Sequence, residues 1–175
     1  MDAGCGWGRF PIPASKIVGG SGKVYAVDIS EEAINALRGE VRRRNINNIE
    51  TITGDITKRL PIDNESVGVV LMANILHGLK AGGKADNALR EMYRVLKPGG
   101  IGSGVFLNPV TARMPPIVIR LAPEEVEELV GKHGFKRKGF FNIGKHRYAI
   151  TFTKPSQSRN SVKPFTRRRT SCNNG

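Results

Sequence analysis

Three alternating glycines near the start constrain the fold of this chain more than any other feature. They are Gly4, Gly6 and Gly8, in the stretch Met-Asp-Ala-Gly-Cys-Gly-Trp-Gly-Arg-Phe. Glycine adopts backbone conformations that other residues avoid, and its missing Cβ lets a ligand approach the main chain. The spacing differs from the dinucleotide fingerprint Gly-x-Gly-x-x-Gly, because the positions that would need glycine hold Arg9 and Pro11. We therefore expect a cofactor loop here, and we disfavour nicotinamide or flavin binding.

The composition is that of one globular domain. A chain of 175 residues can bury its own core, and 39% hydrophobic and 25% charged residues fit a soluble protein. Neither an apolar run of roughly 18 residues nor a leader-like start is present, so we expect a cytoplasmic protein without a membrane span. The cysteines, Cys5 and Cys172, form neither a disulfide framework nor a zinc-binding pattern. We expect no metal site and interpret Cys5 as a small loop residue, not a nucleophile.

The positive charge is concentrated at the C-terminal end. About half of the net charge of +13 lies in residues 154–175, which contain no acidic residue. The Ser, Asn, Arg and Pro content from residue 155 onward predicts a disordered basic tail at 155–175, after a domain at 1–154. No basic stripe interleaved with aromatic residues is present. A nucleic-acid partner stays open but is not favoured over a solvated basic surface.

Strand and helix patterns alternate along the chain. Helices are expected within residues 8–22, from Ser30 to Arg44, at Asp86–Lys97 and from Pro123 to Gly134; strands at Lys23–Asp28, Ile49–Thr53, Ser66–Leu76 and Ile101–Leu107; and a hairpin at Lys138–Ile143 and Arg147–Phe152. The valine-rich run of the fourth segment predicts a strand covered on both faces. A proline-rich loop at Asn108–Pro116 is of the kind that lines a cleft. The predicted fold is α/β, with a doubly wound, mostly parallel sheet ending in an antiparallel hairpin.

Acidic residues follow two of these strands. Asp28 closes the second strand 20 residues after Gly8, an interval that returns an end-of-strand carboxylate to a ligand, where it can accept both hydroxyls of a ribose. Asp55 follows the third strand after Gly54, although an acid in a turn is the plainer interpretation. We expect Asp2, Asp28 and Asp55 to converge on one ligand at the same edge of the sheet.

A longer sequence motif makes these patterns more specific for one protein family. The glycine loop, the two acids and Ala-Leu-Arg-Glu-Met-Tyr-Arg-Val-Leu-Lys-Pro-Gly-Gly at residues 88–100 resemble class I S-adenosylmethionine-dependent methyltransferases. The resemblance is to the ubiquinone/menaquinone-biosynthesis-like (type 11) group and covers about Met1 to Lys154. It implies a Rossmann-like fold and S-adenosylmethionine as cofactor. Carried over by position, it assigns these roles: Asp2, Gly4, Cys5, Gly6 and Gly8 form the loop around the methionine portion, Asp28 binds the ribose, Ile29 packs on adenine, Asp55 between Gly54 and Ile56 binds the adenine amine, and Asn74 lies beside the sulfonium.

The resemblance has a gap at its front. In this family a buried central strand, and usually a helical segment, precede the glycine loop, whereas only Met1 precedes Asp2 here. Three or four missing strand side chains would cost a sum comparable with the stability of a whole domain. We therefore expect a largely missing first strand, explained by an N-terminally truncated chain or by a strand from a partner, including a second copy of the chain.

His77 is the candidate catalytic residue, because it follows the fourth strand and its imidazole can titrate near neutrality. Packing at the start of a helix is the alternative interpretation. The sequence Asn74-Ile75-Leu76-His77 replaces the Asn-Pro-Pro-aromatic signature of amino-methyltransferases, which favours a small-molecule oxygen or carbon acceptor. An RNA or protein methyltransferase, and a non-catalytic cofactor-binding remnant acting as a subunit, are the alternatives.

Overall fold

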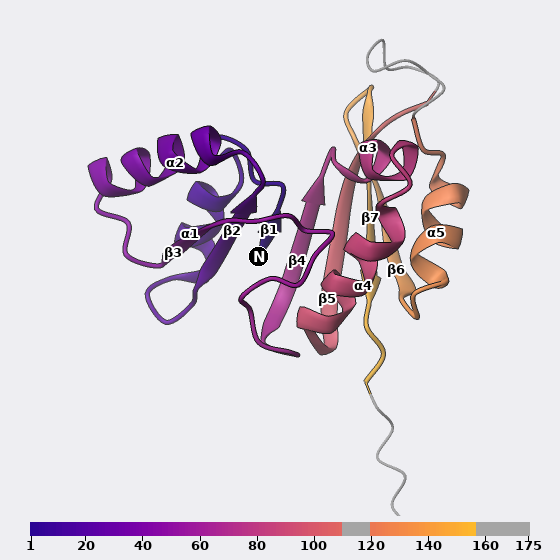
Figure 1. The fold of residues 1–175 in the computed structure, drawn as a ribbon. Helices are drawn as coiled ribbons and strands as arrows, with labels where there is room; N and C mark the ends of the chain where they lie inside the picture. Colours follow the sequence, from indigo (N-terminus) through magenta and orange to yellow (C-terminus); the bar gives the residue numbers. More distant parts are fainter. Residues whose placement is uncertain (110–119, 157–175) are drawn as a thin grey trace, which may run out of the picture.

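The computed structural model describes residues 1–109 and 120–156. Most of the loop expected at Asn108–Pro116 and of the tail expected at 155–175 lies outside the described residues. In the part of the chain that is described, seven strands form one sheet in the order β3-β2-β1-β4-β5-β7-β6 (Figure 1). The strands are β1 (Asp2–Ala3), β2 (Val24–Asp28), β3 (Ile49–Thr53), β4 (Val67–Ala73), β5 (Leu96–Leu107), β6 (Lys136–Ile143) and β7 (Arg147–Thr153).

The sheet has the predicted directions. The pairs from β3 through β2, β1 and β4 to β5 are parallel, and β7 pairs antiparallel with both β5 and β6. The helices are α1 (Pro11–Val18), α2 (Glu31–Arg43), α3 (Leu76–Ala81), α4 (Ala85–Val95) and α5 (Pro123–Gly131). The doubly wound α/β fold with a terminal hairpin is therefore confirmed.

Local signals explain where helix α2 begins and where helix α4 ends. Ser30 caps α2, since its hydroxyl oxygen accepts the N–H of Ala33 at 3.2 Å. Helix α4 ends at Val95, two residues before the predicted end, because Leu96 already has an extended backbone with ψ of 133°. Proline two positions later disfavours helical geometry in the residue before it, so β5 starts directly.

Two apolar clusters lie on opposite faces of the sheet. On β2, Ala26 belongs to the smaller cluster with Ile34 and Leu37 of α2, whereas the next residue, Val27, belongs to the larger one. Because side chains alternate across a strand, these neighbours point to opposite faces. The larger cluster includes residues of α4, α5 and β7 and carries most of the core.

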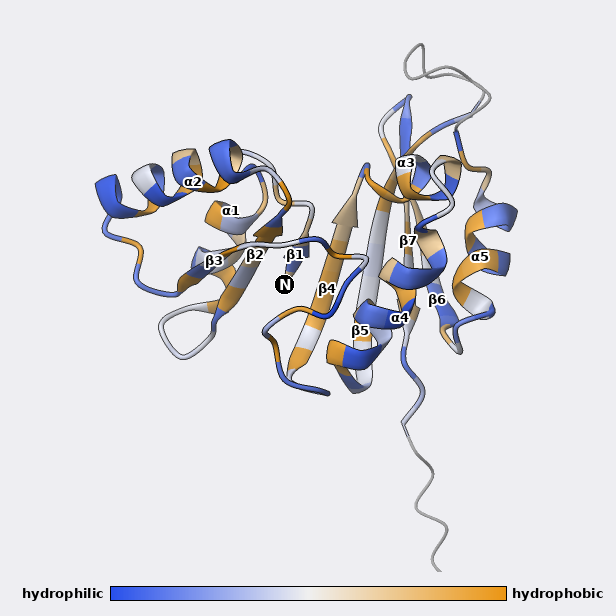
Figure 2. Ribbon diagram, in the orientation of Figure 1, coloured by the Kyte–Doolittle hydropathy of each residue, from blue (hydrophilic) through white to orange (hydrophobic). Residues whose placement is uncertain are grey.

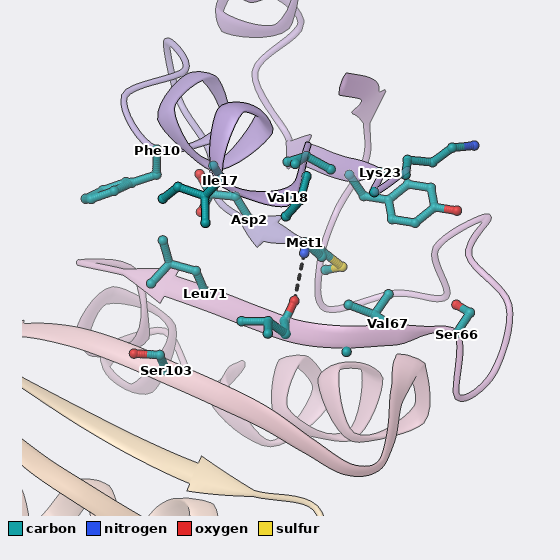
Figure 3. A pocket seen from close by; sticks show the side chains of 16 residues that line it. Met1, Asp2, Phe10, Ile17, Val18, Lys23, Ser66, Val67, Leu71 and Ser103 are labelled. Carbon is teal, nitrogen blue, oxygen red and sulfur yellow. Dashed lines mark hydrogen bonds between the residues drawn. The ribbon is translucent and has the colours of Figure 1, made fainter. Parts of the chain in front are cut away.

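The central strand β1 is short, as predicted, with two residues between the longer strands β2 and β4. The N-terminus accordingly lies in the middle of the sheet (Figure 1). The ammonium group of Met1 donates to the carbonyl oxygen of Val69 on β4 at 2.7 Å (Figure 3).

The prediction that β4 is covered on both faces is wrong. Figure 2 shows an apolar strand, and Val70 and Met72 are buried in the larger cluster. Val69, on the other face, is 54% exposed. That face borders a groove of about 650 Å³ between β4 and α1, so a continuous apolar run here does not mean burial on both sides (Figure 3).

Candidate functional site

The loop between β1 and α1 depends on glycine for two different reasons. Gly4, Gly6 and Gly8 have φ angles of +80°, +50° and +90°, which side-chain-bearing residues rarely adopt. A Cβ on Gly4 would lie 2.7 Å from Ile75, and one on Gly8 would lie 2.4 Å from Leu37. A Cβ on Gly6 would meet no protein atom within 4 Å. Packing therefore excludes a side chain at the first and third glycines, while the backbone of Gly6 stays open to a ligand.

Asp28 holds this loop in place from the end of β2. Its Oδ2 accepts the N–H of Gly6 at 2.7 Å, and its Oδ1 accepts the N–H of Ser30 at 2.9 Å. Each carboxylate oxygen has more than one acceptor direction, so Asp28 keeps acceptor capacity for a ligand hydroxyl. The carboxylate thus fixes the loop and faces the ligand side at the same time.

A cavity of about 310 Å³ lies at the carboxyl ends of the first strands, within the usual size of ligand pockets. Six residues predicted from the sequence line it: Gly4, Asp28, Ile29, Gly54, Asp55 and Ile56. The sequence interpretation missed its other lining residues, which are Thr57, Ile75, Gly78, Leu79 and Lys84. Ile75, Gly78 and Leu79 follow β4, and a position after a strand was a usable signal for a ligand site. No such signal marks Lys84, which directly precedes α4.

Asp55 fits both interpretations that the sequence left open. Its Oδ1 accepts the N–H of Thr57 at 2.9 Å and the hydroxyl of Thr57 at 2.7 Å, as an acid in a turn does. These hydrogen bonds lower the pKa of Asp55. The residue also lines the cavity, with Oδ2 4.0 Å from the ammonium of Lys58. The turn therefore presents an ionised carboxylate to the cavity.

Asp2 lies elsewhere. It is 3% exposed, lines the groove of about 650 Å³ instead of the smaller cavity, and neither of its carboxylate oxygens has a hydrogen-bond partner. Burial raises its pKa to about 7, against the opposing effect of the Met1 ammonium. The structure thus brings together two of the three acids expected to converge, Asp28 and Asp55, and separates Asp2 from their cavity.

Five further predicted residues lie outside the cavity lining: Gly6 and Gly8 of the glycine loop, and Cys5, Asn74 and His77. Cys5 is 5% exposed and packs in the smaller apolar cluster, where burial raises the pKa of its thiol to about 12. Asn74 is exposed after β4 with a φ of +57°, and its N–H donates to the carbonyl oxygen of Val105. His77 is half-buried on α3, and burial lowers its pKa. Their roles toward a ligand stay predictions.

Two negative findings hold for residues 1–109 and 120–156. No three His, Cys, Asp or Glu side chains there are grouped so that they could hold a metal ion. No helix in that part of the chain is both long and apolar enough to cross a bilayer.

Comparison with known families now adds to this geometry. A family model described as a methyltransferase domain matches residues 1–100. The chain belongs to the methyltransferase domain family. Residues 1–100 of this methyltransferase domain contain the glycine loop and all the residues that line the small cavity.

Curated relatives cover the same region. The chain is 38% identical over 101 residues to a demethylmenaquinone methyltransferase of Staphylococcus carnosus, and 34% identical over 101 residues to one of Geobacillus stearothermophilus. Each alignment covers 58% of this chain, but only 39% and 42% of the two relatives. The aligned part of this chain thus spans about two fifths of the length of these relatives.

Solved structures support the fold over a longer stretch. A SAM dependent methyltransferase from Aquifex aeolicus superposes with a TM-score of 0.80 at 25% identity, covering 87% of this chain and 80% of that one. A [4+2]-cyclase, SpnF, superposes with a TM-score of 0.76 at 17% identity, covering 89% and 74%. Since the second likeness shows the fold alone, the fold does not decide the reaction.

The residues present fit S-adenosylmethionine, the cofactor that the family implies. Gly6 offers an open backbone, and Asp28 and Asp55 present carboxylates to one cavity. Ile29, 71% exposed on the cavity rim, offers an apolar surface to a flat ring. Hydroxyls, an amine and an aromatic ring are the groups that these side chains can bind, and the adenosyl part of the cofactor has all three.

Proposed function

We propose that this chain holds S-adenosylmethionine in an enzyme that transfers the cofactor's methyl group to a small-molecule oxygen or carbon acceptor. One observation carries the proposal: Asp28 binds the glycine loop and lines the same cavity as Asp55. In this proposal Asp28 accepts the ribose hydroxyls, Asp55 accepts the adenine amine, and Ile29 packs on the adenine ring. Asn74 lies beside the sulfonium.

The cofactor supplies an activated methyl group, so the protein's main task is to position the acceptor behind it. His77 is the proposed base for an acceptor that must lose a proton. Burial lowers its pKa, which keeps the imidazole neutral at pH 7 and able to accept that proton. The similarity to two demethylmenaquinone methyltransferases supports a small-molecule acceptor.

Titration calorimetry with S-adenosylmethionine and with S-adenosylhomocysteine tests the cofactor site. We expect both ligands to bind at one site per chain. A chain that binds neither would refute the proposal. Binding without methyl transfer to any quinol-like acceptor would instead favour a non-catalytic, cofactor-binding subunit.

A second measurement, RNA binding at several salt concentrations, separates a small-molecule enzyme from an RNA methyltransferase, which the net charge of +13 keeps as an alternative. RNA binding through phosphates weakens steeply as salt rises, because counterions are released. We expect cofactor affinity that changes little with salt and no specific RNA binding at physiological ionic strength. Tight, sequence-dependent RNA binding there would favour the alternative.

A further inference from the structure

The loop that carries Gly54 and Asp55 is held from outside by helix α4. This loop joins β3 to β4 and comprises residues 54–66. Glu91 of α4 is 7% exposed, and its Oε1 accepts the backbone N–H of Leu60 at 2.7 Å. A carboxylate is seldom buried without partners, and here one of its partners is the main chain of this loop.

Arg94, one turn further along α4, binds the same loop at several points. Its Nη1 donates to the carbonyl oxygen of Ile62 and to Oδ1 of Asn64, both at 2.7 Å, and its Nη2 donates to the carbonyl oxygen of Leu60 at 3.3 Å. Its Nε donates to Oε2 of Glu91 at 2.8 Å. The pair therefore binds the loop over residues 60–64 through both donors and acceptors.

The contact continues from Leu60 to the cavity. A Cβ built on Gly54 would lie 3.2 Å from Cδ2 of Leu60, so this side chain packs directly against the Gly54 backbone. Leu60 is 4% exposed, and Ile56, which lines the cavity, is 9% exposed in the same apolar cluster. A shift of Leu60 would therefore move the support beneath the residues that flank Asp55.

The charges of the pair favour this arrangement. Burial alone raises the pKa of Glu91, but hydrogen bonds from Arg94 and from Leu60 outweigh burial, so the net pKa is lowered. Glu91 is thus an ionised acceptor for the Leu60 N–H. Buried ion pairs contribute little to stability compared with apolar residues of similar size, so a positioning role explains this pair better than a stabilising one.

We infer that Glu91 and Arg94 are positioning residues for the adenine end of the cofactor site, acting through Leu60 on Gly54 and Asp55. The inference rests on the proposed function, since it assigns the adenine to this cavity. Neither side chain lines the cavity. Their effect must therefore be carried by the loop.

The test compares Glu91→Gln and Arg94→Lys with a matched control in the full chain. Glutamine keeps the size of Glu91 but replaces one acceptor of Arg94 by a donor; lysine keeps the charge of Arg94 but loses its fork. The control is Tyr148→Phe on β7, which removes a buried hydrogen bond from the Tyr148 hydroxyl to the carbonyl oxygen of Leu121. Strand β7 lies toward the other end of the sheet from β3.

Two readouts separate positioning from stability. Calorimetry with S-adenosylmethionine and with adenosine, on fully folded samples, should show five- to twentyfold weaker binding of both ligands to Glu91→Gln and a smaller loss for Arg94→Lys. Hydrogen exchange should become faster at the amides of residues 54–60 in these variants. The control should keep the wild-type affinity and the wild-type exchange at 54–60.

Wild-type affinity in both α4 variants, or an equal loss in the control, would overturn the inference. If Glu91→Gln does not fold, Arg94→Lys decides by the same criteria. If the wild-type chain binds no cofactor, the proposed function fails. Hydrogen exchange at 54–60 then judges the positioning step alone, and unchanged exchange overturns it.

Discussion

The small cavity and the larger groove differ in how the protein binds the carboxylates that line them. In the small cavity, Asp28 accepts two backbone N–H groups and Asp55 accepts the N–H and hydroxyl of Thr57. In the larger groove, both oxygens of Asp2 are buried and unpartnered. Donors supplied by the loop make the first site a preorganised acceptor for a ligand. Because no such donors reach Asp2, an ionised Asp2 carboxylate destabilises the folded state.

The pH dependence of stability should expose this difference most strongly. The folded pKa of Asp2 is about 7, against 3.8 for an exposed aspartate. Between these values the folded chain holds a proton that the unfolded chain releases, so stability falls as pH rises from about 4 to about 7. The shift corresponds to about 4 kcal/mol at neutral pH.

Asp2→Asn removes that titration. Chemical denaturation from pH 4 to pH 8 should show the variant gaining stability relative to wild type by about 1.4 kcal/mol per pH unit up to pH 7. The difference between the two proteins cancels the titrating groups that do not interact with Asp2. The Met1 ammonium, whose pKa burial lowers to about 6, does interact with Asp2, so acetylating the N-terminus of both proteins removes its contribution. A constant difference across this range would mean that Asp2 is ionised and paired in solution.

Ligand affinity tests the small cavity, which Asp28 and Asp55 line. Asp28→Asn leaves one acceptor oxygen where two backbone N–H groups need two. We expect the affinity for S-adenosylmethionine to fall ten- to a hundredfold, about 1.4 to 3 kcal/mol, as for hydrogen bonds to charged groups. Asp55→Asn should cost less, because the amide oxygen can still accept both hydrogen bonds from Thr57 that Oδ1 of Asp55 accepts.

Glu50→Gln is the matched control for both variants. It also exchanges an acid for an amide on the sheet, but Glu50 lies on β3 in an exposed ion pair with Lys23. Surface pairs of this kind contribute little. Calorimetry that finds equal losses in Asp28→Asn and Glu50→Gln would remove Asp28 from the binding site.

Local patterns in the sequence predicted the fold, and spacing predicted part of the site. The order of strands and helices followed from periodicity and from caps such as Ser30, and the 20-residue interval identified Asp28 at the cavity. Strand alternation explains the position of Asp2 only once the structure shows which face Ala3 occupies. Ala3 is in the larger core cluster, so its neighbour Asp2 must face the opposite side of the sheet.

Other features of the site depend on contacts between residues far apart in the sequence. Ile75, which lies 71 positions further along the chain, leaves no room for a Cβ at Gly4, and Leu37 leaves none at Gly8. Glu91 accepts the N–H of Leu60. None of these pairs has a local pattern. The open face of β4 was equally hidden, because an apolar run such as Val69–Met72 looks the same whether one face of the strand is covered or both.

The smallest expected effect tests the groove itself. Ile17 of α1 is 84% exposed beside the groove and Val69 of β4 is 54% exposed, so neither side chain gains much from folding. Ile17→Ser should therefore change the free energy of unfolding by no more than about 0.5 kcal/mol, as surface substitutions do. Leu37→Ser, at a fully buried position on α2, is the contrasting variant and should cost several times more. Denaturation of both variants at one pH compares them directly. A loss of about 2 kcal/mol or more for Ile17→Ser would mean that something covers this apolar wall in solution, and Asp2 would then be expected to find its hydrogen-bond partners in that cover.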